Sequence, residues 1–132
     1  MKTHVFRLHP GDDLRLSLER YAREHRIGAA VLVSCVGSLR HVRLRDASGV
    51  TIREADGDHE IVSATGIVSQ ERLHIHVSLS REDLSVIGGH LAEGCIIKTT
   101  AEVVLLEMED VAFGKVFDPA TGYHELDIRP AP

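Results

Sequence analysis

Hydrophobic and polar positions change their spacing once near the start of the chain. Residues 5–8 alternate between apolar and polar side chains, as expected for a strand with one face in solvent. Beyond them, apolar residues recur at helical spacing, at Leu14, Leu18, Tyr21 and Ala22. The pattern predicts a short strand followed by one amphipathic helix, which Asp12 or Asp13 can cap and which ends near Gly28.

Most of the remaining chain has the pattern of strands. Residues 29–39 are almost all apolar and rich in β-branched side chains, which predicts a buried strand broken at Gly37. Residues 60–68 and 73–80 are two strand-like runs joined by a short polar stretch, as in an antiparallel hairpin. Residues 95–109 are apolar on both faces toward their end, so we predict that they form the longest strand, in a central position.

Shorter segments complete the predicted architecture. Residues 50–53 suggest a weak strand between two turns, and residues 111–117 a last strand before a turn and a short tail. Residues 81–94 contain a glycine pair and have no clear period, which predicts a loop lying against the sheet. The sequence therefore predicts a single α+β domain, residues 1–132, in which about seven mainly antiparallel strands pack with one main helix.

Charge narrows the class of partner. The chain has 15 Lys and Arg against 20 Asp and Glu, which gives a formal net charge of −5. This sign is wrong for a surface that works mainly by neutralising phosphates. Aromatic residues, which stack on unpaired bases, make up only 4% of the chain. The composition therefore counts against nucleic acid as a partner of the isolated domain.

Several features bear on location. No stretch approaches the roughly 18 uninterrupted apolar residues of a membrane span, and the N-terminal segment has no apolar core of signal-peptide length. Cys35 and Cys95 lie inside apolar runs, which predicts reduced thiols in the core and no disulfide. We expect a cytoplasmic protein that does not associate with a membrane.

One stretch, LHIHVSLSREDLSVIGGHL, concentrates histidines. Side chains alternate along a strand, so His74 and His76 lie on one face, close enough to share a cation. His90 can supply a third ligand, because Gly88 and Gly89 permit the predicted loop to fold back over that face. Three imidazoles with an open position favour zinc, although nickel, copper and iron accept the same ligands.

Glu102 is a further candidate near this site. It lies in the predicted long strand in phase with Lys98 and Thr100. If that face lines the same pocket, its carboxylate can orient a ligating imidazole or accept a proton from a metal-bound water. No other arrangement of nucleophile and base stands out in the sequence.

A plainer interpretation competes with the metal site. His74 and His76 can be the polar half of an amphipathic strand facing water, with His90 hydrogen-bonded in a loop. Spacing alone favours this interpretation, because a His-X-His pair on a strand is a weak signal. The other histidines are most simply surface residues: His4, His9, His25, His41, His59 and His124.

The motifs taken together resemble a known family, the plants and prokaryotes conserved domain, or PPC domain. The resemblance covers residues 8–126 and rests on PGDDL, VGSL, HEIVSATG, LHIHVSLS, GGHLAEG, KTTAEVVL and DPATGYHEL in this order. It implies a homotrimer of domains with a sheet of about seven mostly antiparallel strands and one main helix. It also implies a metal site at the HxH and GGH histidines, here His74, His76 and His90, and thereby favours the metal interpretation.

The family is often labelled DNA-binding, because its plant members carry AT-hooks that grip the minor groove. This chain contains no AT-hook, so that label transfers poorly to it. Two classes of function stay open: a trimeric interaction or DNA-associated module with structural histidines, and a small metal-dependent enzyme or ligand-binding protein. The substrate or ligand does not follow from these residues.

Overall fold

The computed structural model describes all 132 residues and contains one helix and eight strands. In chain order the elements are β1 (Lys2–Leu8), α1 (Leu14–Glu24), β2 (Ala30–Arg45), β3 (Ile52–Val68), β4 (Leu73–Ser80), β5 (Val86–Leu91), β6 (Ile96–Glu107), β7 (Val111–Asp118) and β8 (Tyr123–Pro130). The strands pair in antiparallel fashion throughout, which confirms the predicted α+β class. No helix has the length and apolar character needed to cross a bilayer.

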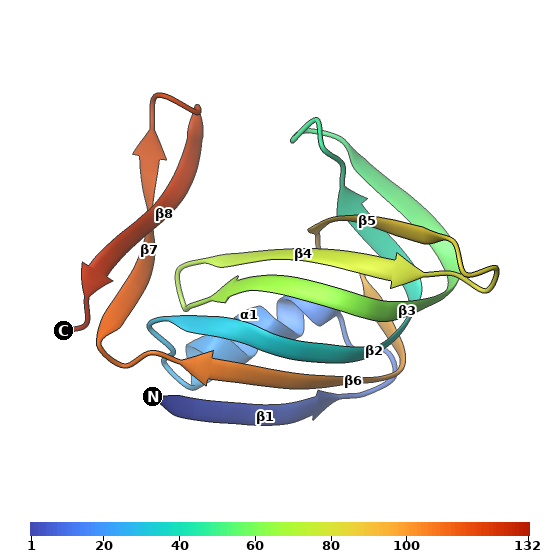
Figure 1. Cartoon of the computed structure of the whole chain (residues 1–132), viewed down its shortest axis with the longest axis horizontal. Coiled ribbons are helices and arrows are strands. Elements are labelled where there is room, and N and C mark those ends of the chain that lie inside the picture. Colours follow the sequence, from blue (N-terminus) through green and yellow to red (C-terminus); the bar gives the residue numbers. More distant parts are fainter.

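Six strands form one curled sheet in the order β1-β6-β2-β3-β4-β5 (Figure 1). The far end of β2 also pairs with β5, through Leu44 with Leu91 and Arg45 with His90, so the sheet closes on itself at that end. Register shifts along β2 allow this long strand to bend. Gly37 lies at one of them, where a Cβ atom would meet the carbonyl oxygen of Thr100 from β6, so the glycine permits close strand approach and does not break the strand.

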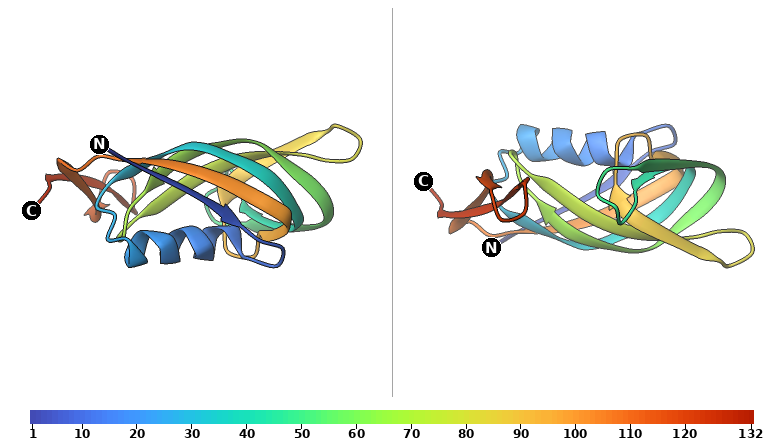
Figure 2. Two further views of the ribbon diagram at one scale, coloured as in Figure 1. Left: turned by 90° about the horizontal axis from the view of Figure 1, so that it is seen from below. Right: turned by 90° about the horizontal axis from the view of Figure 1, so that it is seen from above.

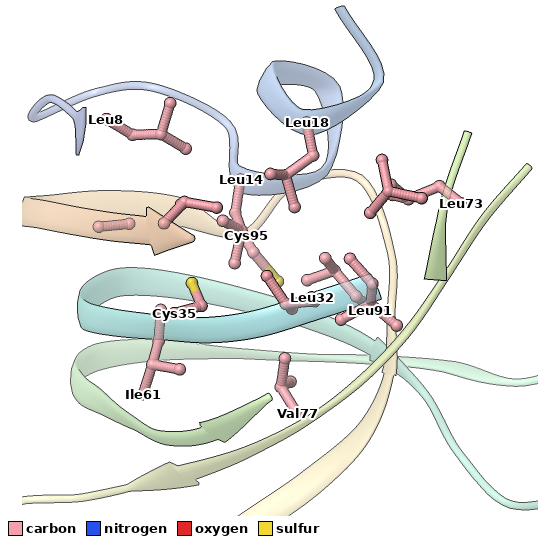
Figure 3. Close-up of a cluster of buried hydrophobic side chains, with 14 of the residues drawn as sticks. Leu8, Leu14, Leu18, Leu32, Cys35, Ile61, Leu73, Val77, Leu91 and Cys95 are labelled. Carbon is pink, nitrogen blue, oxygen red and sulfur yellow. The ribbon is translucent and has the colours of Figure 1, made fainter. Parts of the chain in front are cut away.

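Helix α1 covers the concave face of the curled sheet (Figure 2). Asp13 caps it by accepting a hydrogen bond from the backbone N–H of Leu16. Leu14 and Leu18 point from the helix into a continuous core with side chains of the sheet (Figure 3). Both cysteines lie in this core, and burial raises the pKa of each thiol to about 11, as expected for reduced apolar residues.

Strands β7 and β8 form a separate two-stranded hairpin that extends from the larger sheet (Figure 1). The hydroxyl of Ser69, in the turn between β3 and β4, donates to the carbonyl of Phe113, whose own N–H donates to the carbonyl of Gly28. Arg72, in the same turn, donates to the carbonyl of His124. Both strands of the hairpin are therefore held against the turn before β4.

Several predicted boundaries were wrong. The helix ends at Glu24, four residues before Gly28, because the chain turns at His25 and Arg26, the latter with a φ of 52°. The segment 81–94 contains strand β5, whose pairing with β2 and β4 supplies the hydrogen bonds that its weak pattern does not suggest. One of the two turns expected beside residues 50–53, at residues 55–59, lies inside β3. The prediction that residues 95–109 form the longest strand was also wrong, since β3 has 17 residues and β6 has 12. The expected tail forms β8.

Candidate metal centre

The alternation predicted for residues 73–80 is present in β4. Leu73, Ile75, Val77 and Leu79 are buried in the core, while His74 is partly buried and His76 is exposed on the other face. On the neighbouring strand β5, His90 is the direct partner of His76 in the ladder. Directly opposed residues project on the same face of a sheet, so His74, His76 and His90, hereafter the histidine cluster, converge on one side.

The three rings of the histidine cluster are mutual neighbours. Their centroids are separated by 5.1 Å (His74 to His76), 5.3 Å (His74 to His90) and 5.6 Å (His76 to His90). One nitrogen from each ring lies within 4.8 Å of the others. In a tetrahedral site with metal–nitrogen bonds of about 2.0–2.1 Å, ligand nitrogens are separated by roughly 3.4 Å. Small side-chain rotations therefore suffice to bring all three nitrogens onto one ion.

His90 reaches the cluster by a different route from the one predicted. It belongs to a strand and not to a loop that folds back over the sheet. Neither Gly88 nor Gly89 has a positive φ, so neither acts as a hinge. A Cβ at Gly89 would lie 2.8 Å from the carbonyl oxygen of Arg45, and one at Gly88 would lie 2.6 Å from that of Val77. The two glycines allow β2, β5 and β4 to approach closely, and this closeness places His90 beside His76.

The surroundings of His74 and His90 favour neutral imidazoles. Burial and then the positive charge of Arg45 lower the pKa of His90 to about 4. Burial and then the charge of Arg72 lower the pKa of His74. Nδ1 of His90 is buried and has no hydrogen-bond partner within the chain. A neutral imidazole with a free lone pair is the form that ligates a metal ion, so the cluster fits a cation in both geometry and protonation state.

Two arginines stand beside the histidine cluster. Arg45 is the ladder partner of His90, and Nη2 of Arg72 lies 3.2 Å from Nδ1 of His74. The Nε atoms of both arginines are buried and have no hydrogen-bond partner. Sequence reasoning missed them: Arg45 ends the RHVRLR stretch, which has the pattern of a solvated strand face, and Arg72 lies in a predicted turn. The one available signal was that Arg72 precedes His74 by two residues and so shares its face.

A hollow of about 530 Å³ opens next to these side chains and is hereafter called the basic hollow. It lies between one side of α1, the turn before β4, the turn after β2 and the β7–β8 hairpin. Its wall carries more basic than acidic side chains, and both His74 and His90 contribute to it. Its charged and histidine residues are Arg15, Glu19, Arg23, Arg45, Glu71, Arg72, His74, His90, Lys115, His124 and Glu125. The histidine cluster is therefore accessible to a small molecule.

Glu102 does not join the histidine cluster within the chain. It is exposed on β6, where its ladder partners are Arg7 on β1 and Val36 on β2. Strands β2 and β3 separate β6 from β4 in the sheet order, so the carboxylate is remote from His74 and His76. The alternation of the sequence predicted the face of the sheet on which Glu102 lies. It did not predict the distance across that face from Glu102 to the histidines.

Two of the histidines expected at the surface are buried. His4 is 4% exposed, with Nε2 at 2.8 Å from Glu107 and Nδ1 at 3.0 Å from the hydroxyl of Tyr21. His59 is 2% exposed, and its Nδ1 lies 2.9 Å from the carbonyl of Gly57. Both predictions were wrong because sequence context gives no sign of the hydrogen-bond partners that a buried imidazole finds in the fold.

Solved structures of the same shape come from several organisms. A hypothetical protein of Salmonella enterica superposes with a TM-score of 0.94 at 29% identity, over 98% of this chain and 94% of that one. A metal-containing protein from Archaeoglobus fulgidus gives 0.77 at 30% identity, over 96% and 93%. A candidate DNA-binding protein of Bacteroides thetaiotaomicron gives 0.84 at 20% identity, over 95% and 91%, which shows a common fold alone.

Two comparisons of sequence complete the picture. The bifunctional protein GlmU of a Synechococcus strain is 38% identical over 98% of this chain, which spans 21% of the length of that relative. The pattern of the Plants and Prokaryotes Conserved domain, abbreviated PCC or PPC, matches residues 1–109, from β1 to the end of β6. With that match and the fold in agreement, the chain belongs to the Plants and Prokaryotes Conserved (PCC) domain family.

Proposed function

We propose that the protein binds a divalent transition metal through His74, His76 and His90. The observation that carries this proposal is the convergence of three imidazoles whose nitrogens lie within 4.8 Å of one another. The unpartnered Nδ1 of His90 supports it, because a buried ring nitrogen without a hydrogen bond is costly unless a ligand occupies it. The relative from Archaeoglobus fulgidus, described as metal-containing, supports it independently.

Zinc is the metal that we favour. Three nitrogen ligands with one open position are typical of zinc sites that bind a water or substrate, whereas structural zinc sites use four protein ligands. Nickel, copper and iron accept imidazole as well, so the identity needs measurement. A bound zinc ion would supply Lewis acidity at the open position. The chain's own contribution is to hold three neutral imidazoles in place and to surround them with arginines.

The test is a metal analysis of protein purified without a histidine tag and then dialysed against a zinc buffer. The expected result is about one zinc ion per chain, held through gel filtration. The His74→Ala protein should retain far less. Wild-type protein that emerges metal-free under these conditions contradicts the proposal.

We also infer that the domain assembles as a homotrimer. Several valines on the outer face of the sheet are exposed, which is unfavourable for a monomer when they lie together. These are Val5 on β1, Val33 and Val36 on β2, and Val62 on β3. Contact with two further copies would cover them. Light scattering coupled to size exclusion should report about three times the 14.5 kDa chain mass, and a monomer at micromolar concentration contradicts the inference.

A DNA-associated role has less support. The net charge of −5 disfavours a phosphate backbone as partner, and the basic residues near the cluster line a hollow instead of a continuous stripe. We expect weak or no binding of labelled duplex DNA at about 0.15 M salt. Submicromolar binding that weakens steeply with salt would favour the DNA-associated role over a ligand-binding one.

A further inference from the structure

Arg45 lies beside the histidine cluster and has a side-chain N–H without an acceptor in the chain. Its ladder partner is His90, so its side chain projects beside the histidine cluster. The neighbouring arginines of β2 and β3 are paired, Arg43 with Glu54 and Arg53 with Asp46. Nε of Arg45, by contrast, is buried without an acceptor, although Asp46 follows it directly in the chain. A buried N–H donor without an acceptor is costly, so an acceptor from outside the chain would stabilise this position.

Arg72 shows the same feature on the other side of the cluster. Its Nη1 donates to the carbonyl of His124, its Nη2 contacts Nδ1 of His74, and its Nε is buried without a partner. A guanidinium can only donate, so Nδ1 of His74 accepts and the proton of this ring is on Nε2. His74 cannot keep this hydrogen bond when either of its nitrogens ligates a cation. Ligation at Nδ1 uses the lone pair, and ligation at Nε2 moves the ring proton to Nδ1.

The charges around the cluster do not balance. Three neutral imidazoles leave a divalent cation with its full charge, and two guanidinium groups add to it. Among the carboxylates of the basic hollow, Glu19 pairs with Arg15 and Glu71 pairs with Arg129. Glu125 is then the one acidic group there without an ion pair. Two guanidinium groups directly beside a cation site are unfavourable unless an anion lies between them.

We propose that Arg45 and Arg72 bind the oxyanion group of a small-molecule ligand, a carboxylate or a phosphate, one oxygen of which takes the open position of the metal. This inference rests on the proposed metal site and names the class of ligand that the site accepts. A guanidinium is a planar fork that matches both oxyanions. The basic hollow, at about 530 Å³, has the size of a small-molecule site. Its outer wall carries Lys115 and Tyr123 of the hairpin, which can contact the rest of the ligand.

The geometry also couples the two binding events. Metal binding ends the contact between Arg72 and His74 and so frees Nη2 of Arg72 to donate to an oxyanion. The oxyanion in turn offsets the charge that opposes the metal. Each ligand should therefore increase the affinity for the other by the same factor, as linkage requires. Binding of phosphate or acetate to the metal-free protein should be weak.

The experiment replaces zinc by cobalt(II), whose visible absorption bands report the ligands around the ion. Cobalt-loaded protein, freed of excess metal by gel filtration, is titrated separately with inorganic phosphate and with acetate, and the anion that binds more tightly identifies the preferred oxyanion. We expect the bands of the wild-type protein to shift with saturation. Arg45→Met and Arg72→Met should keep the cobalt but weaken anion binding by about tenfold or more.

Arg40→Met is the matched control. Arg40 is exposed on the same strand as Arg45, and its removal changes the net charge equally, but it lines neither the basic hollow nor the cluster. It should titrate as the wild type does. Equal anion binding in the wild type, Arg45→Met and Arg72→Met, or no spectral change in the wild type at millimolar anion, overturns the proposal. Failure of the wild type to take up cobalt overturns the metal site itself and is thus a distinct result.

A second measurement covers the case in which a variant does not fold well. Removing a partly buried guanidinium whose Nε has no acceptor should not destabilise the metal-free protein, so Arg45→Met should unfold at an equal or higher urea concentration than the wild type. Arg45→Lys, which keeps the charge but not the fork, should bind the anions with intermediate affinity. Marked destabilisation by Arg45→Met would mean that Arg45 supports the fold, which contradicts its assignment to a ligand.

Discussion

His41 and His90 lie on paired strands near the closed end of the sheet, yet they have opposite electrostatic surroundings. His41 is partly buried on β2 and lies between two carboxylates, 2.6 Å from Asp56 and 3.2 Å from Glu54. His90 on β5 faces Arg45 and has a buried Nδ1 without a partner. The ring of His41 therefore has carboxylates as its neighbours, whereas the ring of His90 has a guanidinium.

The difference separates satisfied histidines from open ones. His4 belongs with His41, because Glu107 and the hydroxyl of Tyr21 occupy both of its ring nitrogens. A ring whose nitrogens are occupied by the chain has no lone pair to offer, and its role is structural. A ring that has a free nitrogen and mostly positive neighbours is disfavoured as an ion and available as a ligand. The histidine cluster is the place in the molecule where such rings meet.

The largest effect should come from removing a cluster ring. His76→Ala deletes an exposed side chain, so the fold should survive, but two imidazoles alone should bind zinc far more weakly. We expect the metal content after gel filtration to fall from about one ion per chain to near zero. His41→Ala is the matched control and should keep the metal. Retention of zinc by His76→Ala would show that His76 is not a ligand and does not differ from His41 in this respect.

The next effect concerns stability, for which a structural histidine should matter more than a histidine of the cluster. In metal-free protein, His4→Ala should lower the free energy of unfolding by about 2 kcal/mol or more, because it opens space in the core and leaves the Glu107 carboxylate without its partner. His76→Ala should change it by about 0.5 kcal/mol or less, since its side chain is exposed. Urea unfolding followed by circular dichroism measures both. Similar losses for the two variants contradict the assignment of His4 to structure and His76 to ligation.

A smaller effect should follow from moving a ligand without deleting it. Gly89→Ala places a methyl group 2.8 Å from the carbonyl oxygen of Arg45, so β5 must shift away from β2 and carry His90 with it. We expect weaker zinc binding together with a loss of about 1 kcal/mol in stability. Gly28→Ala is the control, because its Cβ meets nothing closer than 3.6 Å. Unchanged zinc affinity in Gly89→Ala would show that the close approach is not needed for ligation.

The fold was largely accessible from the sequence, because it depends on local patterns. Alternation in residues 73–80 predicted which face of β4 carries His74 and His76, and capping chemistry predicted the start of α1 at Asp12 or Asp13. Strand β5 was missed because its pattern is interrupted by Gly88 and Gly89. Those glycines have meaning only in relation to the strands that they approach, and no local pattern reveals which strands these are.

The candidate site was predicted in part for the same reason. The resemblance to the family named the three histidines, but the arginines beside them come from separate segments of the chain. Arg45 reaches His90 only because the sheet closes between β2 and β5, and Arg72 is held by the hairpin through the carbonyl of His124. Within one chain Glu102 is not a neighbour of the cluster, because phase along a strand does not encode the distance across a sheet. Long-range pairing decides which charges surround a site.

The comparison between His41 and His90 also makes a prediction about pH, in metal-free protein. Hydrogen bonds to Asp56 and then to Glu54 raise the pKa of His41 above its usual 6.5. The folded protein therefore binds this proton more tightly than the unfolded chain does. The resulting stability is fully present below pH 6.5 and is lost as the pH rises through the folded pKa.

His90 should show the opposite dependence. Burial is the main cause of its lowered pKa, about 4, and the charges that face it, Arg45, His74, Arg15 and His76, act in the same direction. Between pH 6.5 and 4 the unfolded chain binds a proton at this ring that the folded protein does not, so this contribution to stability falls as the pH falls. NMR titration of the ring protons should place the midpoint of His41 above 6.5 and that of His90 near 4, so that between these values one ring is charged while the other is neutral. A midpoint for His90 at or above 6.5 would mean that it accepts a proton as readily as an exposed histidine. The metal would then have to displace that proton in order to bind.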